Sequence, residues 1–197
     1  MNIVIFRHIL YYGSTAKHSM EGVSYLGGVC DKGYRTLVIE ARYYQRTVQT
    51  ATHELGHSLG ADHDGEGDAV ACKSEDSFIM TNHTPHTNKE RPYIRNTWFF
   101  SNCSVESFRK TLINKECVKT MGEVFNTVEW NNFMKKQPGD VFTPQEECSL
   151  VFGPGSTYYG NVSEDQCHLL TCIDPTGKKR KKYMYSANGT TCGANKV

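Results

Sequence analysis

The segment from His53 to His63 has the pattern HExxHxxGxxH, and this pattern constrains the chain more than any other feature of the sequence. It predicts a helix over 43–59, on which His53 and His57 are four residues apart and project from the same side. Gly60 can adopt the left-handed conformation that ends a helix, so that His63 returns as a third ligand. Three imidazole nitrogens and one remaining tetrahedral position are typical of a catalytic zinc site.

Glu54 stands beside the first histidine and is not expected to be a ligand itself. Zinc lowers the pKa of a bound water to about 7. A neighbouring carboxylate can take a proton from that water and return it to a leaving amine. The pattern therefore indicates a zinc-dependent hydrolase, and a surface helix with chance histidines is the less favoured interpretation. The opposite side of the helix is expected to be buried and comprises Val48, Ala51, Thr52, Leu55 and Leu59.

The phrase HELGHSLGADHD resembles the zinc motif of the metzincin metallopeptidases. Asp64, which follows the third histidine, directs the resemblance to the reprolysin branch, with its adamalysin, ADAM and ADAMTS proteins and the venom and tick-salivary metalloproteases. The resemblance implies an α+β fold with a mixed sheet and an active-site helix, and one Zn²⁺ per chain. It also implies a methionine turn, matched by residues 77–80, in which Met80 lies below the metal without binding it.

Three strand candidates precede the helix. The segment 2–10 is rich in Ile, Val and Phe and predicts a buried strand, and 34–40 predicts a shorter one. The segment 22–30 is similar to the family's edge strand, to which an extended substrate peptide can add as a further strand. An ordinary hairpin strand is the alternative. The resemblance implies these substrate-binding residues: Gly22, Val23, Ser24, Tyr25 and Leu26.

Eight cysteines indicate disulfides and an oxidising compartment. Zinc–thiolate sites are the alternative, but the sequence has no CxxC pair. The pairs that the resemblance implies are Cys30–Cys117, Cys72–Cys103 and Cys148–Cys172. It leaves the partner of Cys167 open between Cys192 and a cysteine beyond the end of the chain. Four N-glycosylation sequons agree with secretion; they begin at Asn82, Asn102, Asn161 and Asn188.

The resemblance also implies a division of the chain. Residues 1–118 resemble a partial reprolysin-type catalytic domain, 119–137 a linker, and 138–197 a partial ADAMTS-like disintegrin or cysteine-rich module. Within the first part, Ser104 is expected to be the N-cap of a helix that ends near Cys117. Only 52 residues precede His53. We therefore expect the sequence to begin inside a longer protein, with the signal peptide in the missing N-terminal part.

Charge restricts the partners. A net charge of +1 gives no argument for nucleic acid, and no apolar run is long enough to span a membrane. The basic run 177–182 is interpreted as a solvated loop, a heparin-binding patch or a processing site. The acidic segment 62–76 is interpreted as a solvated loop, so that Ca²⁺ is possible but not indicated.

These sequence features are compatible with two functions. The favoured one is a secreted zinc metalloendopeptidase that cleaves extracellular proteins, by resemblance those of the matrix or plasma. The alternative is a non-catalytic binding protein that acts through the Cys-rich module and the basic run.

Overall fold

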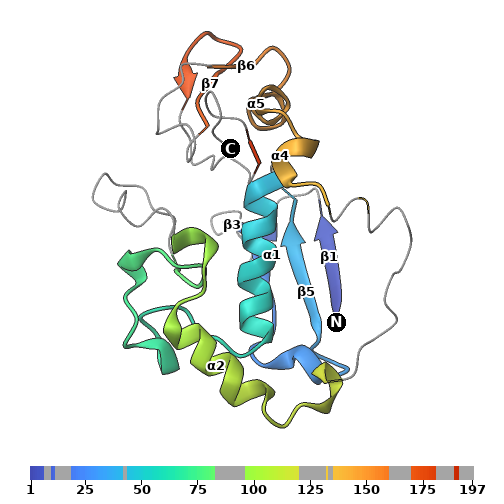
Figure 1. The fold of residues 1–197 in the computed structure, drawn as a ribbon, viewed down its shortest axis with the longest axis vertical. Helices are drawn as coiled ribbons and strands as arrows, with labels where there is room; N and C mark the ends of the chain where they lie inside the picture. Colours follow the sequence, from blue (N-terminus) through green and yellow to red (C-terminus); the bar gives the residue numbers. More distant parts are fainter. Residues whose placement is uncertain are drawn as a thin grey trace. The chain divides into compact units, whose positions relative to one another are not determined.

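The computed structural model describes residues 1–6, 10–11, 19–41, 44–82, 96–119, 132, 135–159, 170–180 and 189–190. The chain forms two compact units, one of residues 1–42 and 47–121 and the other of residues 43–46 and 122–197. Both units contain helices and strands (Figure 1), so the mixed α and β fold class expected from the sequence is confirmed.

The sheet of the first unit has the strand order β1–β5–β4. β1 (Asn2–Phe6) runs parallel to β5 (Thr36–Glu40), and β4 (Gly22–Val23) runs antiparallel to β5. Leu37 and Ile39 of the central strand are fully buried. A separate antiparallel pair consists of β2 (Leu10–Tyr11) and β3 (Ser19–Met20).

Within the segment predicted as a strand over 2–10, β1 forms over Asn2–Phe6 and residues 7–9 lie outside the described ones; the prediction that β1 is buried is wrong. All five residues of β1 are exposed, and Ile5 is 58% exposed. β1 is the outer strand of the described sheet, and its side chains are exposed on both faces. The edge strand predicted over 22–30 is shorter than expected, because only Gly22–Val23 pairs with β5 and Gly28–Cys30 forms a 3-10 helix, η1.

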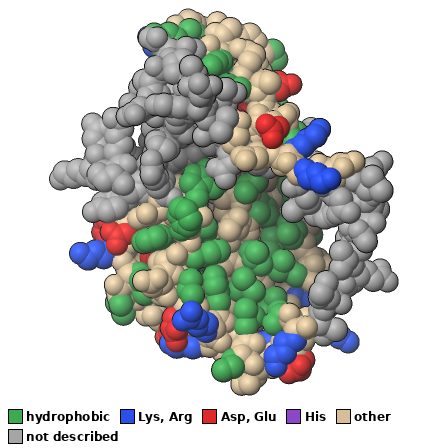
Figure 2. All heavy atoms as spheres, in the orientation of Figure 1, with side chains coloured by type: hydrophobic (Ala, Val, Ile, Leu, Met, Phe, Trp, Pro, Cys, Tyr) green, Lys and Arg blue, Asp and Glu red, His purple; other side chains and the backbone are tan. Residues whose placement is uncertain are grey.

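Helix α1 (Tyr44–Ser58) matches the helix predicted over 43–59 and is next to β5 in the view of Figure 1. Its buried side differs from the prediction. Thr50, Glu54 and Ser58, each one helical turn from the next, are buried, whereas Val48 is exposed and the other predicted stripe residues are only partly buried. The polar side is buried because it faces the segment around β4, where Glu54 accepts a hydrogen bond from Ser24. Figure 2 shows hydrophobic side chains gathered over α1, β5 and β1.

Helix α2 (Asn102–Leu112) begins with a cap that differs from the predicted one. The hydroxyl of Ser101 accepts a hydrogen bond from the backbone N–H of Ser104 at 3.2 Å. Ser101 is therefore the N-cap, and Ser104 lies one turn inside the helix, where it is buried. Further 3-10 segments among the described residues of this unit are η2 (Gly67–Ala69), η3 (Ser74–Asp76) and η5 (Glu116–Val118), and residues 96–98 are also in this conformation.

The second unit has a small core around one disulfide. Its elements are α4 (Pro138–Val141), α5 (Pro144–Phe152), β6 (Thr157–Tyr158), β7 (Cys172–Ile173) and β8 (Lys179–Arg180). Thr143 and Glu146 form a capping box that starts α5. Cys148, Leu170 and Cys172 form the buried core. Among the described residues this core contains both sulfurs of one disulfide, and disulfides contribute strongly to the stability of small modules.

Three disulfides join the described cysteines: Cys30–Cys117, Cys72–Cys103 and Cys148–Cys172. These are the pairs that the family resemblance implied. The predictions for Cys167, Cys192, Asn161 and Asn188 lie outside the described residues. Within the described ranges, no helix is long and apolar enough to cross a bilayer.

Candidate metal centre

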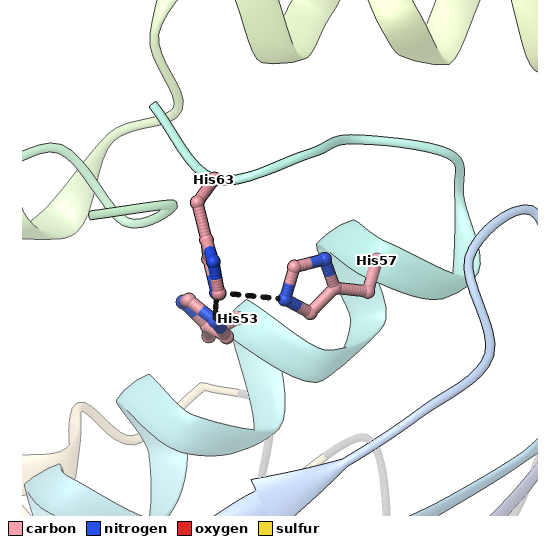
Figure 3. Close-up of side chains that lie close together, drawn as sticks. All are labelled: His53, His57 and His63. Carbon is pink, nitrogen blue, oxygen red and sulfur yellow. Dashed lines mark hydrogen bonds between the residues drawn. The ribbon is translucent and has the colours of Figure 1, made fainter. Parts of the chain in front are cut away.

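The three histidines of the motif converge on one point (Figure 3). Nε2 of His63 lies 3.2 Å from Nε2 of His53 and 3.1 Å from Nε2 of His57. In a tetrahedral zinc site with Zn–N distances of about 2.0–2.1 Å, neighbouring nitrogens are about 3.3–3.4 Å apart. The two separations in this structure are about 0.1–0.3 Å shorter than that value, and the ligand atoms of all three histidines lie within 4.8 Å of one another, so the cluster fits a zinc ion.

The local sequence explains the convergence. His53 and His57 are one turn apart on α1, and their rings lie with centroids 4.7 Å apart. Gly60 then has a φ of +103°, a conformation that non-glycine residues rarely adopt. A Cβ at Gly60 would also collide with the side chain of Thr111. The chain can therefore turn sharply after α1 and bring His63 back over the helix.

Backbone acceptors fix the tautomers of two ligands. Nδ1 of His53 donates to the carbonyl oxygen of Ile79, and Nδ1 of His57 donates to that of Ala61, each at 2.8 Å. Because a carbonyl can only accept, each Nδ1 carries the hydrogen and each Nε2 presents a lone pair. Burial lowers the pKa of His57, which favours its neutral, metal-binding form.

Residues 77–80 form the turn that lies against α1. Met80 is fully buried, and a Cβ at Gly56 would collide with its sulfur. The same turn supplies two carbonyl acceptors, since Ile79 O bonds to His53 and Met80 O accepts from the N–H of Asp64 at 2.9 Å. The turn therefore contacts the metal-binding segment both through the packing of a side chain and through its backbone.

Glu54 is buried and is held by the segment that the sequence assigned to substrate binding. The hydroxyl of Ser24 lies 2.8 Å from Glu54 Oε2 and 2.8 Å from the Glu54 carbonyl oxygen, and it donates to both. A Cβ at Gly22 would come within 2.7 Å of Glu54 Cγ. Burial raises the pKa of Glu54, and the hydrogen bond from Ser24 opposes that shift. Gly22 and Ser24 thus contact Glu54, while Val23, Tyr25 and Leu26 are exposed.

Asp64 is a buried group whose structural role the sequence did not reveal. It is fully buried, and its Oδ1 accepts a hydrogen bond from the hydroxyl of Ser101 at 2.6 Å. Within the described chain its Oδ2 has no hydrogen-bond partner. Burial raises the pKa of Asp64. The bond to Ser101 joins the residue after the third histidine to the start of α2. The two positions are 37 residues apart, so no local sequence signal could have paired them.

The surface sites predicted from the sequence are exposed where they are described. Asn82 and Asn102 are exposed at the positions of two sequons. Lys178 and Lys179, in the basic run, are exposed, and Nζ of Lys179 lies 3.7 Å from the ring centroid of Tyr159. Residues 181–182 of this run lie outside the described residues.

Comparison with protein families agrees with this geometry. Residues 6–121 match the model of the reprolysin (M12B) family of zinc metalloproteases. The match covers more than half of the chain, and the chain therefore belongs to the reprolysin family. Residues 138–197 match the ADAMTS cysteine-rich domain 2.

Among curated proteins, the chain is similar to members of the group named "a disintegrin and metalloproteinase with thrombospondin motifs". It is 30% identical to member 7 from Rattus norvegicus over 190 residues, which are 93% of this chain and 11% of the relative. It is 27% identical to member 18 from Mus musculus over 173 residues, which are 87% of this chain and 13% of the relative. The chain thus spans about a tenth of the length of these relatives.

Proposed function

We propose that the chain is a secreted zinc metalloendopeptidase that cleaves internal peptide bonds of extracellular proteins. The observation that carries this proposal is the convergence of three Nε2 atoms at 3.1 and 3.2 Å, in the spacing of a tetrahedral zinc site. Membership in a family of zinc metalloproteases supports it. The three disulfides and the exposed sequons at Asn82 and Asn102 support secretion.

His53, His57 and His63 would hold Zn²⁺ through Nε2. The bound ion would supply Lewis acidity for activating water and polarising a carbonyl. Glu54 would act as the general base and then as the general acid, taking the proton of the attacking water and giving it to the leaving amine. Its raised pKa is suited to this role, because a carboxyl with a pKa nearer neutrality can both accept and release a proton. Met80 would support the metal-binding segment from below.

The substrate peptide would lie along the segment of residues 22–26. β4 pairs with β5 on one side, and Val23, Tyr25 and Leu26 present exposed side chains. An extended peptide can add to such an edge through backbone hydrogen bonds, with alternate side chains directed to the protein. Exposed apolar side chains at these positions favour substrates with apolar residues beside the scissile bond.

A mixed peptide library tests the proposal directly. The secreted protein is incubated with the library with and without a zinc chelator, and the products are sequenced by mass spectrometry. We expect cleavage that the chelator abolishes and that added Zn²⁺ restores, together with one zinc per chain by elemental analysis. Absence of cleavage by a protein with one bound zinc would contradict the catalytic proposal, and absence of zinc would contradict the metal site.

Ser24→Ala tests the contact between the β4 segment and the general base. The hydrogen bond from Ser24 favours the ionised form of Glu54, so its loss raises the pKa of that carboxyl. Because the base must be ionised to accept a proton, the acidic limb of the pH–kcat profile should move to higher pH. We also expect kcat to fall near neutral pH, by less than the roughly 10²- to 10⁴-fold that general-base catalysis contributes as a whole, because Glu54 itself is retained. A variant with an unchanged profile would show that Ser24 does not act on Glu54.

The alternative function is a polyanion-binding protein. The exposed Lys178 and Lys179 in the basic run favour it, because clustered lysines attract heparin-like chains. Retention on a heparin column that survives Glu54→Ala, in a protein without proteolytic activity, would favour this alternative. Salt-dependent retention together with chelator-sensitive cleavage would show that both activities reside in the chain.

A further inference from the structure

The third histidine differs from the other two in what its second nitrogen contacts. Nδ1 of His53 and Nδ1 of His57 face backbone carbonyls, whereas Nδ1 of His63 lies 3.4 Å from Oε2 of Glu66. The side chain of Glu66 is 55% exposed and that of His63 is 31% exposed, so neither is held by burial alone. The group that faces the second nitrogen of His63 is therefore a side-chain carboxylate, at an ion-pair distance.

Glu66 is itself held by a further side chain. Nδ2 of Asn82 donates to Oε1 of Glu66 at 2.7 Å, while Oε2 of the same carboxylate faces His63. Oδ1 of Asn82 accepts a hydrogen bond from the hydroxyl of Ser74 at 2.9 Å. The backbone restricts Glu66 as well, because its N–H donates to the carbonyl oxygen of His63 at 3.0 Å. The side chains thus form a connected row: Ser74, Asn82, Glu66 and His63.

We propose that Glu66 and Asn82 are positioning residues for the zinc site: Asn82 holds Glu66, and Glu66 orients the imidazole of His63 with its Nε2 toward the metal. This inference rests on the proposed role of His63 as a ligand. A carboxylate that accepts from the second nitrogen of a metal-binding histidine fixes the tautomer and increases the basicity of the ligand. The acidic loop interpreted from the sequence as merely solvated therefore contributes one carboxylate to the site.

Glu66→Gln tests the first contact. The amide of Gln has one acceptor oxygen, which can face either His63 or Asn82. Its NH₂ group then faces the N–H of the other residue, and two donors cannot form a hydrogen bond. Loss of such a carboxylate typically weakens metal binding by about 10- to 100-fold. We expect zinc to be released to a chromophoric chelator at least about tenfold faster than from the unmodified protein. Glu75→Gln, which removes one charge from an exposed residue of the same loop, is the matched control and should release zinc at the original rate.

Asn82→Asp tests the second contact. It places a carboxylate beside the carboxylate of Glu66, so the two repel each other, and zinc release should again accelerate. Combining Glu66→Gln with Asn82→Asp restores a donor–acceptor pair, with the new amide donating to the new carboxylate. The double variant should therefore release zinc more slowly than either single variant. If the double variant instead accelerates zinc release by the product of the two single accelerations, the two residues act independently, and the proposed contact from Asn82 through Glu66 to His63 is contradicted.

Asn82 begins a sequon, so the loss of a glycan has to be separated from the loss of the amide. Thr84→Ala removes the sequon and leaves Asn82 in place. We expect this variant to retain zinc as the unmodified protein does. Release as fast as from Asn82→Asp would assign the effect to the glycan and contradict the proposal.

An imidazole NMR signal distinguishes positioning from general loop stability. In the zinc-loaded protein, the Nδ1–H proton of each of the three histidines faces an acceptor. This contact slows the exchange of the proton with water, so all three signals should be observable. Glu66→Gln should broaden the signal of His63 alone, because His53 and His57 donate to Ile79 and Ala61. Unchanged signals with zinc still bound would refute the positioning role and leave the metal site intact. A protein that binds no zinc would instead refute the proposed function.

Discussion

Glu54→Gln should slow peptide cleavage by about three orders of magnitude while leaving the zinc content at one ion per chain. An amide has nearly the size of the carboxylate and can still accept from the hydroxyl of Ser24, so the buried pocket stays filled. It cannot accept a proton from water, however, and it cannot deliver one to the leaving amine. General acid–base catalysis contributes about 10²- to 10⁴-fold, and we expect kcat to fall by about three orders of magnitude.

The measurement combines single-turnover cleavage of a fluorogenic peptide with elemental analysis of the same sample. Glu54→Ala should lose at least as much activity, because it also leaves a cavity beside Gly22 and Ser24. His63→Ala is the comparison, and it should lose both zinc and activity. Full activity of Glu54→Gln at normal zinc content would remove Glu54 from the mechanism.

Replacement of both Cys30 and Cys117 by serine should destabilise the first unit more than removal of any other described disulfide. The two residues are 87 positions apart, and a cross-link between distant residues restricts the unfolded chain most. The chain-entropy relation gives a loss of about 4–5 kcal/mol for this pair, and of about 3–4 kcal/mol for Cys72–Cys103, with a separation of 31.

Equilibrium unfolding in guanidinium measures this difference. The chain has two tryptophans, at positions 98 and 130, so Trp130→Phe leaves Trp98 as a reporter of the first unit. Both serine pairs are compared in that background at a fixed, saturating zinc concentration, because bound metal itself stabilises the folded state. A smaller loss for Cys30–Cys117 than for Cys72–Cys103 would contradict the entropic argument.

The sequence predicted the clustering of the three histidines because its determinants are local. The determinants lie within eleven residues: two histidines one turn apart, a glycine that can take a positive φ, and a third histidine. Their spacing alone determines which side chains share one side of the helix and where the chain turns back. The disulfide pairs came from the family resemblance, since spacing cannot assign connectivity. The contacts that hold the site could not be predicted, because Asp64 meets Ser101 across 37 residues and Asn82 meets Glu66 across 16.

Burial was predicted least well. The apolar residues of β1 and the apolar side of α1 were expected inside, yet β1 is exposed along its length and Val48 is exposed on α1. A periodic pattern shows which residues share a side of an element, and it does not show which side another element covers. On α1 the covered side is the one that carries Thr50, Glu54 and Ser58, and it includes the carboxylate of Glu54.

The compactness of the histidine cluster in the sequence has a consequence for biosynthesis. All three histidines belong to one stretch of eleven residues, so bringing them near one another requires only a helix and a short loop, whose formation is fast, before the more distant contacts of Ile79 and Asn82 are made. The bond between Cys30 and Cys117 has to wait for α2 and the segment after it to leave the ribosome. If the cluster binds zinc as proposed, the metal would be available to it before this disulfide forms. We expect the supply of zinc in the compartment of folding to limit the yield of correctly cross-linked protein.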